Sequence, residues 1–582
     1  MIATRGGKAA PEAPFVIEHR EALIYMLCQA AELEHGIMCQ YLFAAFSLKQ
    51  TADEGLTPDQ VDAVTRWRTE VSHVAAQEML HLALVHNLLS AVGGAPHMAR
   101  PNLPQPADHY PAGVELALLP FGRPALEHFM FLERPEGMDL HDADGLAAVA
   151  RARPLMSERD IVPHGQDFAT VGHLYRSIEA GLAHLADRHS EQWLFIGPPR
   201  AQASTEHFHW PELVTVTDLA SAQRAIDTIL EQGEGPRGHW RKAHFGQFVK
   251  ILDEYLDLTE ADPSFDPVRP VIAANVRPPE RDVEVPLITD PVTARVADLF
   301  NVVYEVLLEI FERYFAHTEE TDAQLKILAD AAVDLMLRVI SPLGNLITTL
   351  PAGPDYPGKN AGPSFELFYE TDFLMPHRTA AWAMLTERLG EAAWLCDALC
   401  TGEQLAAQLD PALDALREIT LTLAGQLPPG SPQARHALRM TPLAPGELDA
   451  LLARAAELAQ RVAARPRTGD TADGLARLFD LANSALTVAL RPAGASATPA
   501  GVLTRLVDSV LRPLADALAG QPTAPGPAGG TSPAPADQPG QPGLPLSELL
   551  WQAAQTATEL RVRSGAAASP AELAEATAAL QD

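Results

Sequence analysis

The sequence has few cysteines, few basic residues and no long apolar runs, and each shortage excludes a class of protein. Among its 582 residues are four cysteines, and none forms the paired CxxC units of a zinc ribbon. Lys and Arg number 43 against 75 Asp and Glu, and the net charge of −32 disfavours binding to nucleic acid or to anionic membranes. No run of about 18 apolar residues could span a membrane. No signal-like apolar stretch lies near the start either, so we expect a cytoplasmic protein.

What the sequence does have is an apolar content of 47%, arranged with helical spacing. Apolar residues at steps of three or four predict one long helix over residues 17–50 and a second over 57–92, which ends at Gly93-Gly-Ala-Pro96. A third helix is expected at 168–185, and a fourth begins near 219, breaks at 232–235 and resumes over 240–258. Two long helices joined by a short loop form an antiparallel pair, the first half of a bundle.

The spacing of prolines and helical segments predicts an all-α chain of several parts. Residues 15–260 are expected to form a four-helix bundle with a long irregular, Pro-rich insert (96–135) that contains a short apolar helix. A second helical domain is predicted at 288–400 and an Ala-rich helical segment at 401–490. Pro, Gly, Ala, Thr and Ser dominate 491–545, which predicts a disordered linker, and a terminal helix follows at 546–582.

Two motifs on the first helix pair indicate a metal site. Glu34 lies two helical turns before Tyr41, and Glu78-Met-Leu-His81 places a carboxylate and an imidazole on one face. Ferritin-like di-iron proteins build their sites from single Glu residues and Glu-x-x-His pairs that project into the bundle. The residues around Glu78 and His81 are apolar, and an unpaired carboxylate buried there would cost several kcal/mol, so a partner is required.

The second half of the site is less regular. Glu234 lies between two glycines, and His244 follows on the resumed helix. Because glycine inside a helical pattern is costly, the break could serve to turn Glu234 inward; a plain loop between two helices is the alternative. Glu70 and His73 lie on a more polar stretch and are interpreted as solvated or outer groups. Tyr41 is either a hydrogen-bond donor or radical relay beside the metals, or an ordinary core tyrosine.

These segments resemble a known family. Ala31-Glu-Leu-Glu-His35, Glu78-Met-Leu-His-Leu-Ala-Leu84, Gly93-Gly-Ala-Pro96 and Ile229-Leu-Glu-Gln-Gly-Glu-Gly235, with His244-Phe245, occur in the order and at the spacing of the ferritin-like domain family named for iminophenyl-pyruvate dimer synthase. The resemblance covers about residues 19–256, and a helical extension reaches about residue 400. It implies a bisindole-pathway type of enzyme.

Carried over to this chain, the family pattern implies Glu34, Glu78, His81, Glu234 and His244 as metal ligands. One position departs from it. Where the family has a Glu two residues before a Tyr, this chain has His173 before Tyr175. His173 can bind iron, but a bridging carboxylate is lost; Glu179, about 120° round the helix, could replace it only if the helix were distorted.

The sequence and the resemblance together predict a non-heme oxidase or oxygenase that uses O₂ on a small organic, amino-acid-derived substrate. The expected cofactor is a pair of iron ions, and manganese or a mixed pair suits the same ligands. The competing hypothesis is a non-catalytic metal-binding or scaffold protein. In either case the C-terminal half is expected to contact a partner enzyme or a second copy of the chain.

Overall fold

A computed structural model describes residue 14 and residues 17–105, 115–138, 140–143, 168, 170–235, 239–279, 284–368, 374–400, 405–428 and 431–441. The predicted linker at 491–545 and terminal helix at 546–582 lie outside the described residues, as does most of the predicted helical segment at 401–490. The chain divides into two compact units. One comprises residues up to Ala381 with Leu399–Ala415, and the other comprises Trp382–Ala398 with the residues from Leu416 onward.

The described residues are predominantly helical, which confirms the predicted all-α class. In the first unit the helices are α1 (Arg20–Ser47), α2 (Pro58–Ala91), α3 (Arg123–Leu132), α4 (Val171–His189), α5 (Glu191–Leu194), α6 (Thr205–Phe208), α7 (Leu219–Gly233), α8 (His244–Ala261), α9 (Pro291–Phe315), α10 (Asp322–Leu335) and α11 (Ser341–Ile347). Later helices are α12 (Arg378–Cys400), α13 (Ala406–Ala424) and α14 (Pro432–Met440). None of the helices among the described residues is long and apolar enough to cross a membrane.

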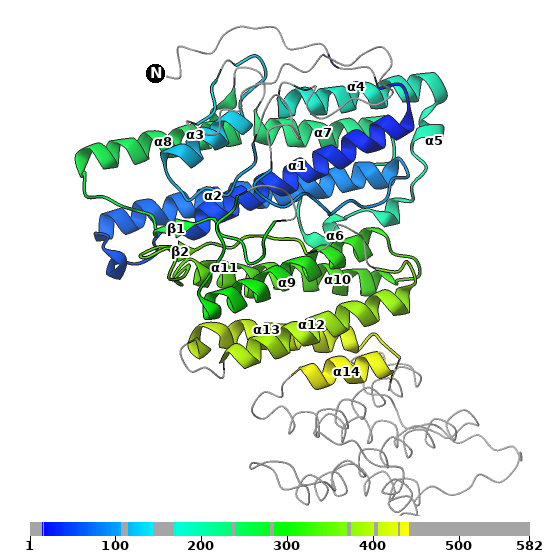
Figure 1. Ribbon diagram of the computed structural model, residues 1–582. Coiled ribbons are helices and arrows are strands. Elements are labelled where there is room, and N and C mark those ends of the chain that lie inside the picture. The colour runs from blue at the N-terminus through cyan, green and yellow to red at the C-terminus, as the bar shows by residue number, and fades with distance from the viewer. Residues whose placement is uncertain are drawn as a thin grey trace, which may run out of the picture. The chain divides into compact units, whose positions relative to one another are not determined.

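Helices α1 and α2 form the predicted antiparallel pair at the centre of the first unit (Figure 1). Helix α2 begins with a capping box, in which the Thr57 side chain accepts from the Gln60 N–H and the Gln60 side chain accepts from the Thr57 N–H. It ends before Gly93, whose φ of +84° is in the left-handed region that favours glycine. Helices α4 and α7 pack on one side of this pair, and α3 packs against α8.

The other side of the pair is covered by α9–α11 (Figure 1). As a result α1 is enclosed on nearly all sides, and 21 of its 28 residues are buried. Helix α10 continues into α11 through one turn of π-helix, η7 (Met336–Ile340). Pro342 explains the widened turn, because proline has no N–H and its ring crowds the carbonyl four residues earlier.

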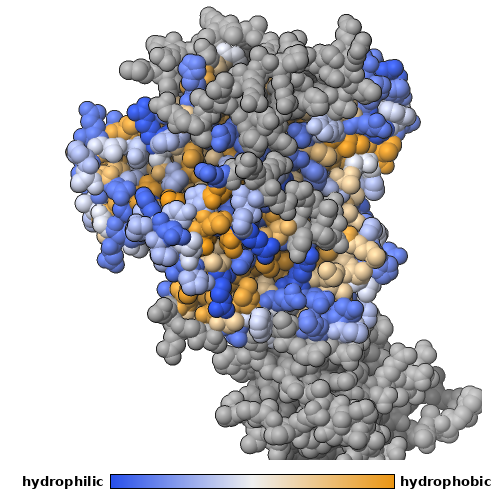
Figure 2. Space-filling view, viewed as in Figure 1, coloured by the Kyte–Doolittle hydropathy of each residue, from blue (hydrophilic) through white to orange (hydrophobic). Residues whose placement is uncertain are grey.

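Strand structure among the described residues is minimal. Strands β1 (Val271–Ile272) and β2 (Asn360–Ala361) pair in parallel, with Val271 opposite Asn360. On the face shown in Figure 2, hydrophilic side chains are interspersed with separate apolar patches.

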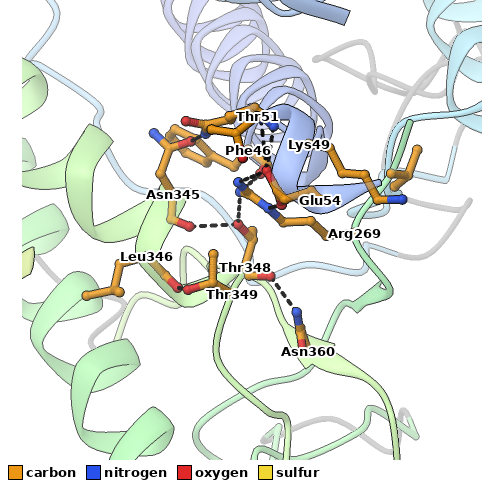
Figure 3. A network of polar contacts seen from close by, with 12 residues as sticks. Phe46, Lys49, Thr51, Glu54, Arg269, Asn345, Leu346, Thr348, Thr349 and Asn360 are labelled. Atoms are coloured by element: carbon orange, nitrogen blue, oxygen red, sulfur yellow. Dashed lines mark hydrogen bonds and ion pairs between the residues drawn. The ribbon is translucent and has the colours of Figure 1, made fainter. Parts of the chain in front are cut away.

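Arg269 joins the bundle to the segments that cover it (Figure 3). Its guanidinium forms a two-point contact with the Glu54 carboxylate, with N···O distances of 2.7 and 3.2 Å. It also donates to the Thr348 hydroxyl at 2.8 Å and to the Phe46 carbonyl at 3.3 Å. Arg269 therefore connects the end of α1, the turn that follows it and the end of α11, and planar two-point pairs of this kind are among the stronger polar contacts.

This contact makes stability depend on pH. Burial alone would raise the pKa of Glu54, but Arg269 and the N–H groups of Gln50 and Thr51 outweigh burial and lower that pKa from its ordinary 4.5. A group whose pKa is lower in the folded state stabilises the fold above its unfolded pKa, and this contribution is lost as the pH falls through the folded pKa.

We predict that Glu54→Gln lowers the free energy of unfolding by about 1 kcal/mol at neutral pH, a figure reduced for partial exposure. The difference from wild type should shrink steadily below about pH 4.5. Urea unfolding of both proteins at several pH values measures this difference in the free energy of unfolding. Glu127→Gln, in the exposed Arg123–Glu127 pair, is the matched control and should change little at any pH. If the effect of Glu54→Gln did not vary with pH, the lowered pKa that we assign to Glu54 would be contradicted.

Candidate metal centre

Five buried ionisable side chains converge inside the bundle from four helices. Glu34 comes from the middle of α1, and Glu78 and His81 come from one face of α2. Glu133 is the residue at which α3 ends, and His244 is the first residue of α8. All five are at most 8% exposed.

Glu78 lies at the centre of this group. One carboxylate oxygen, Oε2, is 2.7 Å from His81 Nδ1, and the other, Oε1, is 2.8 Å from His244 Nδ1. Glu34 lies 3.6 Å from His81 Nδ1, and Glu133 lies 3.7 Å from His244 Nδ1. Two three-residue groups therefore share Glu78, namely Glu34–Glu78–His81 and Glu78–Glu133–His244, and within each group the candidate ligand atoms lie within 4.8 Å of one another.

The two histidines are held in the same way. His81 Nε2 is 3.0 Å from the Gln232 amide oxygen, and His244 Nε2 is 3.1 Å from the Gln77 amide oxygen. Because an amide oxygen only accepts hydrogen bonds, each Nε2 must carry the donated proton. In the neutral ring this leaves Nδ1 with a lone pair that faces Glu78, the arrangement that a metal-binding imidazole needs.

The two outer carboxylates are also held alike, each by a tyrosine. Tyr175 on α4 donates its hydroxyl to Glu34 Oε1, and Tyr41 on α1 donates to Glu133 Oε1 at 2.5 Å. Burial and the neighbouring carboxylates raise the pKa of both tyrosines well above 10, so both remain hydrogen-bond donors. Of the two interpretations of Tyr41 left open by the sequence, its contact with Glu133 supports a donor beside the centre.

The titration behaviour of the group follows from its burial. Burial raises the pKa of Glu34 to about 7, and it also raises the pKa of Glu133. For Glu78 the effect of burial is outweighed by His81 and His244, which lower its pKa well below 4.5. Burial likewise opposes a charge on His244, but Glu78 and Glu133 raise its pKa to about 9. Positive charge is therefore favoured on both sides of Glu78.

The buried donor atoms of this group suit metal ions. Glu78 Oε1 and His244 Nδ1 are fully buried and 2.8 Å apart, and neither has a partner that meets the geometric requirements of a hydrogen bond. Two buried groups that face each other without bonding are arranged as ligands of a common cation. Carboxylate oxygens and imidazoles are also the ligand set of di-iron and di-manganese bundles.

The centre lines a small cavity of about 20 Å³, with room for about one water-sized molecule. Its walls include Glu34, Glu78, His81 and Glu133, together with Arg134 and Glu234. Burial lowers the pKa of Arg134 to about 10, and its guanidinium donates to the Phe131 carbonyl and lies over the Phe131 ring.

Of the six ligands expected from the sequence, the structure brings four together: Glu34, Glu78, His81 and His244. Glu234 lines the cavity but belongs to neither group. Its carboxylate pairs with Arg176 at 2.5 Å and accepts from the Glu136 N–H at 2.8 Å, and a side chain at Gly172 would clash with it.

His173 also lies outside both groups. It is buried in the first turn of α4, its N–H bonds to the Thr170 hydroxyl, and its ring packs against Phe168 at 5.4 Å. Glu179, the alternative to it, is half-buried on α4 and likewise belongs to neither group. The structure therefore places neither His173 nor Glu179 with the other candidate ligands. Helix α4 contributes Tyr175, which donates its hydroxyl to Glu34.

Glu133 is the candidate ligand that sequence reasoning missed. It lies in the Pro-rich insert, at the end of a ten-residue helix, and no motif connects it to α2. The available signal was a carboxylate directly after the apolar run Phe129-Met-Phe-Leu132. Gln77 and Gln232 were missed as well, because an amide beside a histidine has no recognisable spacing in sequence.

Comparison with known proteins agrees with this architecture. Residues 27–253 match the family model described as Ferritin-like. Dichlorochromopyrrolate synthase from Lentzea aerocolonigenes is 29% identical over 418 residues, covering 65% of this chain and 39% of that protein. The 2-imino-3-(indol-3-yl)propanoate dimerase from Chromobacterium violaceum is 27% identical over 384 residues, covering 61% of this chain and 34% of that protein. The chain thus spans less than half the length of either relative.

Among solved structures, a ferritin-like protein from Caulobacter vibrioides aligns with 54% of this chain and 96% of its own, at 19% identity and a TM-score of 0.34.

The geometry predicts which substitutions remove metal. Glu78→Ala should abolish metal binding, because Glu78 belongs to both groups, and Glu133→Ala should remove about half of it. Glu234→Ala and His173→Ala are the matched controls and should retain the wild-type content. Elemental analysis of protein produced with added iron measures the metal per chain, with thermal unfolding to confirm folding. If Glu234→Ala lost as much metal as Glu133→Ala, the ligand set implied by the family resemblance would be preferred.

Proposed function

We propose, from the ferritin-like domain that residues 27–253 form, that this chain is a metal-dependent oxidase of a small organic acid. The domain match confirms the predicted fold, and the relatives confirm the predicted resemblance to bisindole-pathway enzymes. Their names, a synthase and a dimerase, also indicate an enzyme. Metal content, O₂ use and substrate belong to the proposal.

The observation that carries the proposal is the position of Glu78 between two imidazoles that each face it with Nδ1. Structural packing alone would not favour three carboxylates and two histidines in one buried group, because each buried charge costs several kcal/mol unless it is compensated. Two divalent ions would compensate it. Glu34 and His81 would hold one ion, Glu133 and His244 the other, and Glu78 both.

Iron is the metal we propose. Carboxylate oxygens suit the oxidised ion, and imidazoles stabilise the reduced one, so a mixed set supports a redox cycle; manganese accepts the same ligands. When bound, such ions supply a one-electron redox couple and activation of O₂. The protein excludes bulk water from the centre, since all five ligands are buried, and Tyr41 and Tyr175 fix the outer carboxylates.

The proposed substrate is an amino-acid-derived imino acid, as named for the dimerase from Chromobacterium violaceum. Arg134 is one of the residues that line the cavity, and its positive charge would favour a substrate carboxylate there. At about 20 Å³ the cavity is far smaller than the roughly 300 Å³ of a typical ligand site, so the substrate must displace side chains or a neighbouring segment on entry. O₂ is the co-substrate, and a partner enzyme or a second copy remains a proposal for the C-terminal half.

The proposal predicts that anaerobic protein loaded with Fe(II) gains a transient charge-transfer absorption on exposure to O₂. It should also consume O₂ catalytically in the presence of an imino acid that is generated in situ. Stopped-flow spectra and an oxygen electrode measure these. Glu78→Ala, which cannot hold either ion, is the control and should show neither signal. Metal uptake without catalytic O₂ consumption would instead favour the non-catalytic metal-binding alternative, and less than about one metal per chain would exclude both.

A further inference from the structure

A second, much larger cavity lies on the opposite side of the α1–α2 pair from the metal centre. It measures about 410 Å³, within the range of small-molecule sites. The two cavities share no lining residue, so the larger one is a separate site.

One stripe of α2 forms its near wall: Ser72, Ala76, Met79, Ala83 and His86 follow one another at steps of four, three, four and three residues. Side chains two positions apart in a helix point in directions that differ by about 160° around the helix axis. Ala76 therefore faces away from Glu78, and Met79 faces away from His81. Helix α2 presents ligands on one side and the wall of an apolar cavity on the other.

The far wall comes from α9 and from the π-helix η7. Leu307, Leu308 and Phe311 contribute from α9, and Met336, Leu337 and Ile340 contribute from η7. Single π-helical turns are found frequently at functional sites. Leu337 is 67% exposed, so the wall of the cavity reaches solvent at this turn.

The cavity lining contains no Asp, Glu, Lys or Arg. Its ionisable groups are neutral. Burial lowers the pKa of His86 to about 4, and both ring nitrogens are engaged, Nδ1 with the Leu82 carbonyl at 2.8 Å and Nε2 with the His97 N–H at 3.1 Å. Burial raises the pKa of Tyr304 well above 10, and its hydroxyl contacts His35 and Cys39. A charged ligand would find no compensating group here.

The lining is also rich in methionine. Met38, Met79, Met98 and Met336 are four of the chain's 12 methionines. Methionine is flexible and polarisable, packs well against aromatic rings, and is used where one surface adapts to different apolar ligands.

We propose that this cavity binds an uncharged apolar small molecule, with aromatic or hydrocarbon character, at a site independent of the metal centre. Its volume, its neutral lining and the π-helical turn in its wall carry the assignment. The site takes its ligand whether or not the proposed oxidase activity is correct, because none of the five candidate metal ligands lines this cavity.

Two fluorescent probes with one ring framework test the charge requirement on the full chain. N-phenyl-1-naphthylamine is neutral, and 1-anilinonaphthalene-8-sulfonate adds one negative charge. We expect saturable binding of the neutral probe, and at least about tenfold weaker binding of the sulfonate, because a desolvated charge would be uncompensated. Equal affinities for the two probes, or no saturable binding of the neutral one, would overturn the proposal.

A filling substitution tests the location. Leu308→Trp places a larger side chain in the cavity and should weaken binding of N-phenyl-1-naphthylamine by at least about tenfold. Val292→Trp adds the same side chain at an exposed position of the same helix and should leave binding unchanged. If Leu308→Trp does not fold, as judged by thermal unfolding, Ala76→Phe fills the cavity from α2. Binding that survives both filling variants would show that the probe sits elsewhere.

If the filling variants lost probe binding but kept their iron content, the apolar cavity and the metal centre would be independent sites. Loss of iron together with loss of probe binding in a folded Leu308→Trp variant would overturn the claim of independence.

Discussion

The first unit depends on one electrostatic constraint, the burial of Glu78. A carboxylate at this depth is tolerated only when positive charge faces it, and His81 and His244 supply that charge from two different helices. Because His244 is the first residue of α8, this requirement fixes where α8 must begin relative to α2. Glu133, at the end of α3, faces the same histidine at 3.7 Å, and α3 packs against α8. The buried charge of Glu78 thus links α2 to α8, and His244 links α8 to α3.

The α1–α2 pair has two faces with opposite chemistry. Toward α4 and α7 it presents carboxylates and histidine, whose burial is compensated by charge. Toward α9–α11 it presents Met38, Leu42 and the apolar stripe of α2, where no charge is present. A helix enclosed on both sides cannot show the usual single apolar stripe, which explains why α1 is buried at 21 of 28 positions. Arg269 then holds the covering layer against the end of α1.

Much of this architecture could be predicted from sequence because it is local. The helices of the bundle, and the meeting of Glu78 with His81 one turn later, follow from helical periodicity alone. Contacts between distant segments left no such signal. Glu133 meets Tyr41 across 92 positions, and Gln232 meets His81 across 151. His173 was expected as a ligand from a family pattern, and Tyr175, two residues away, is the α4 residue whose side chain reaches Glu34.

The placement of Glu234 has a chemical consequence. Its carboxylate is paired with Arg176, so the candidate ligands within the described residues comprise three carboxylates and two imidazoles, which would be neutral once metal ions replaced their Nδ1 protons. Four carboxylates would balance two divalent ions, whereas three leave one positive charge in excess. A buried excess charge is costly, and it favours the binding of an anion. A substrate carboxylate would supply that anion, and Arg134 at the cavity wall would reinforce the preference. In the proposed oxidase, the Arg176–Glu234 pair would thereby favour an acid as the substrate.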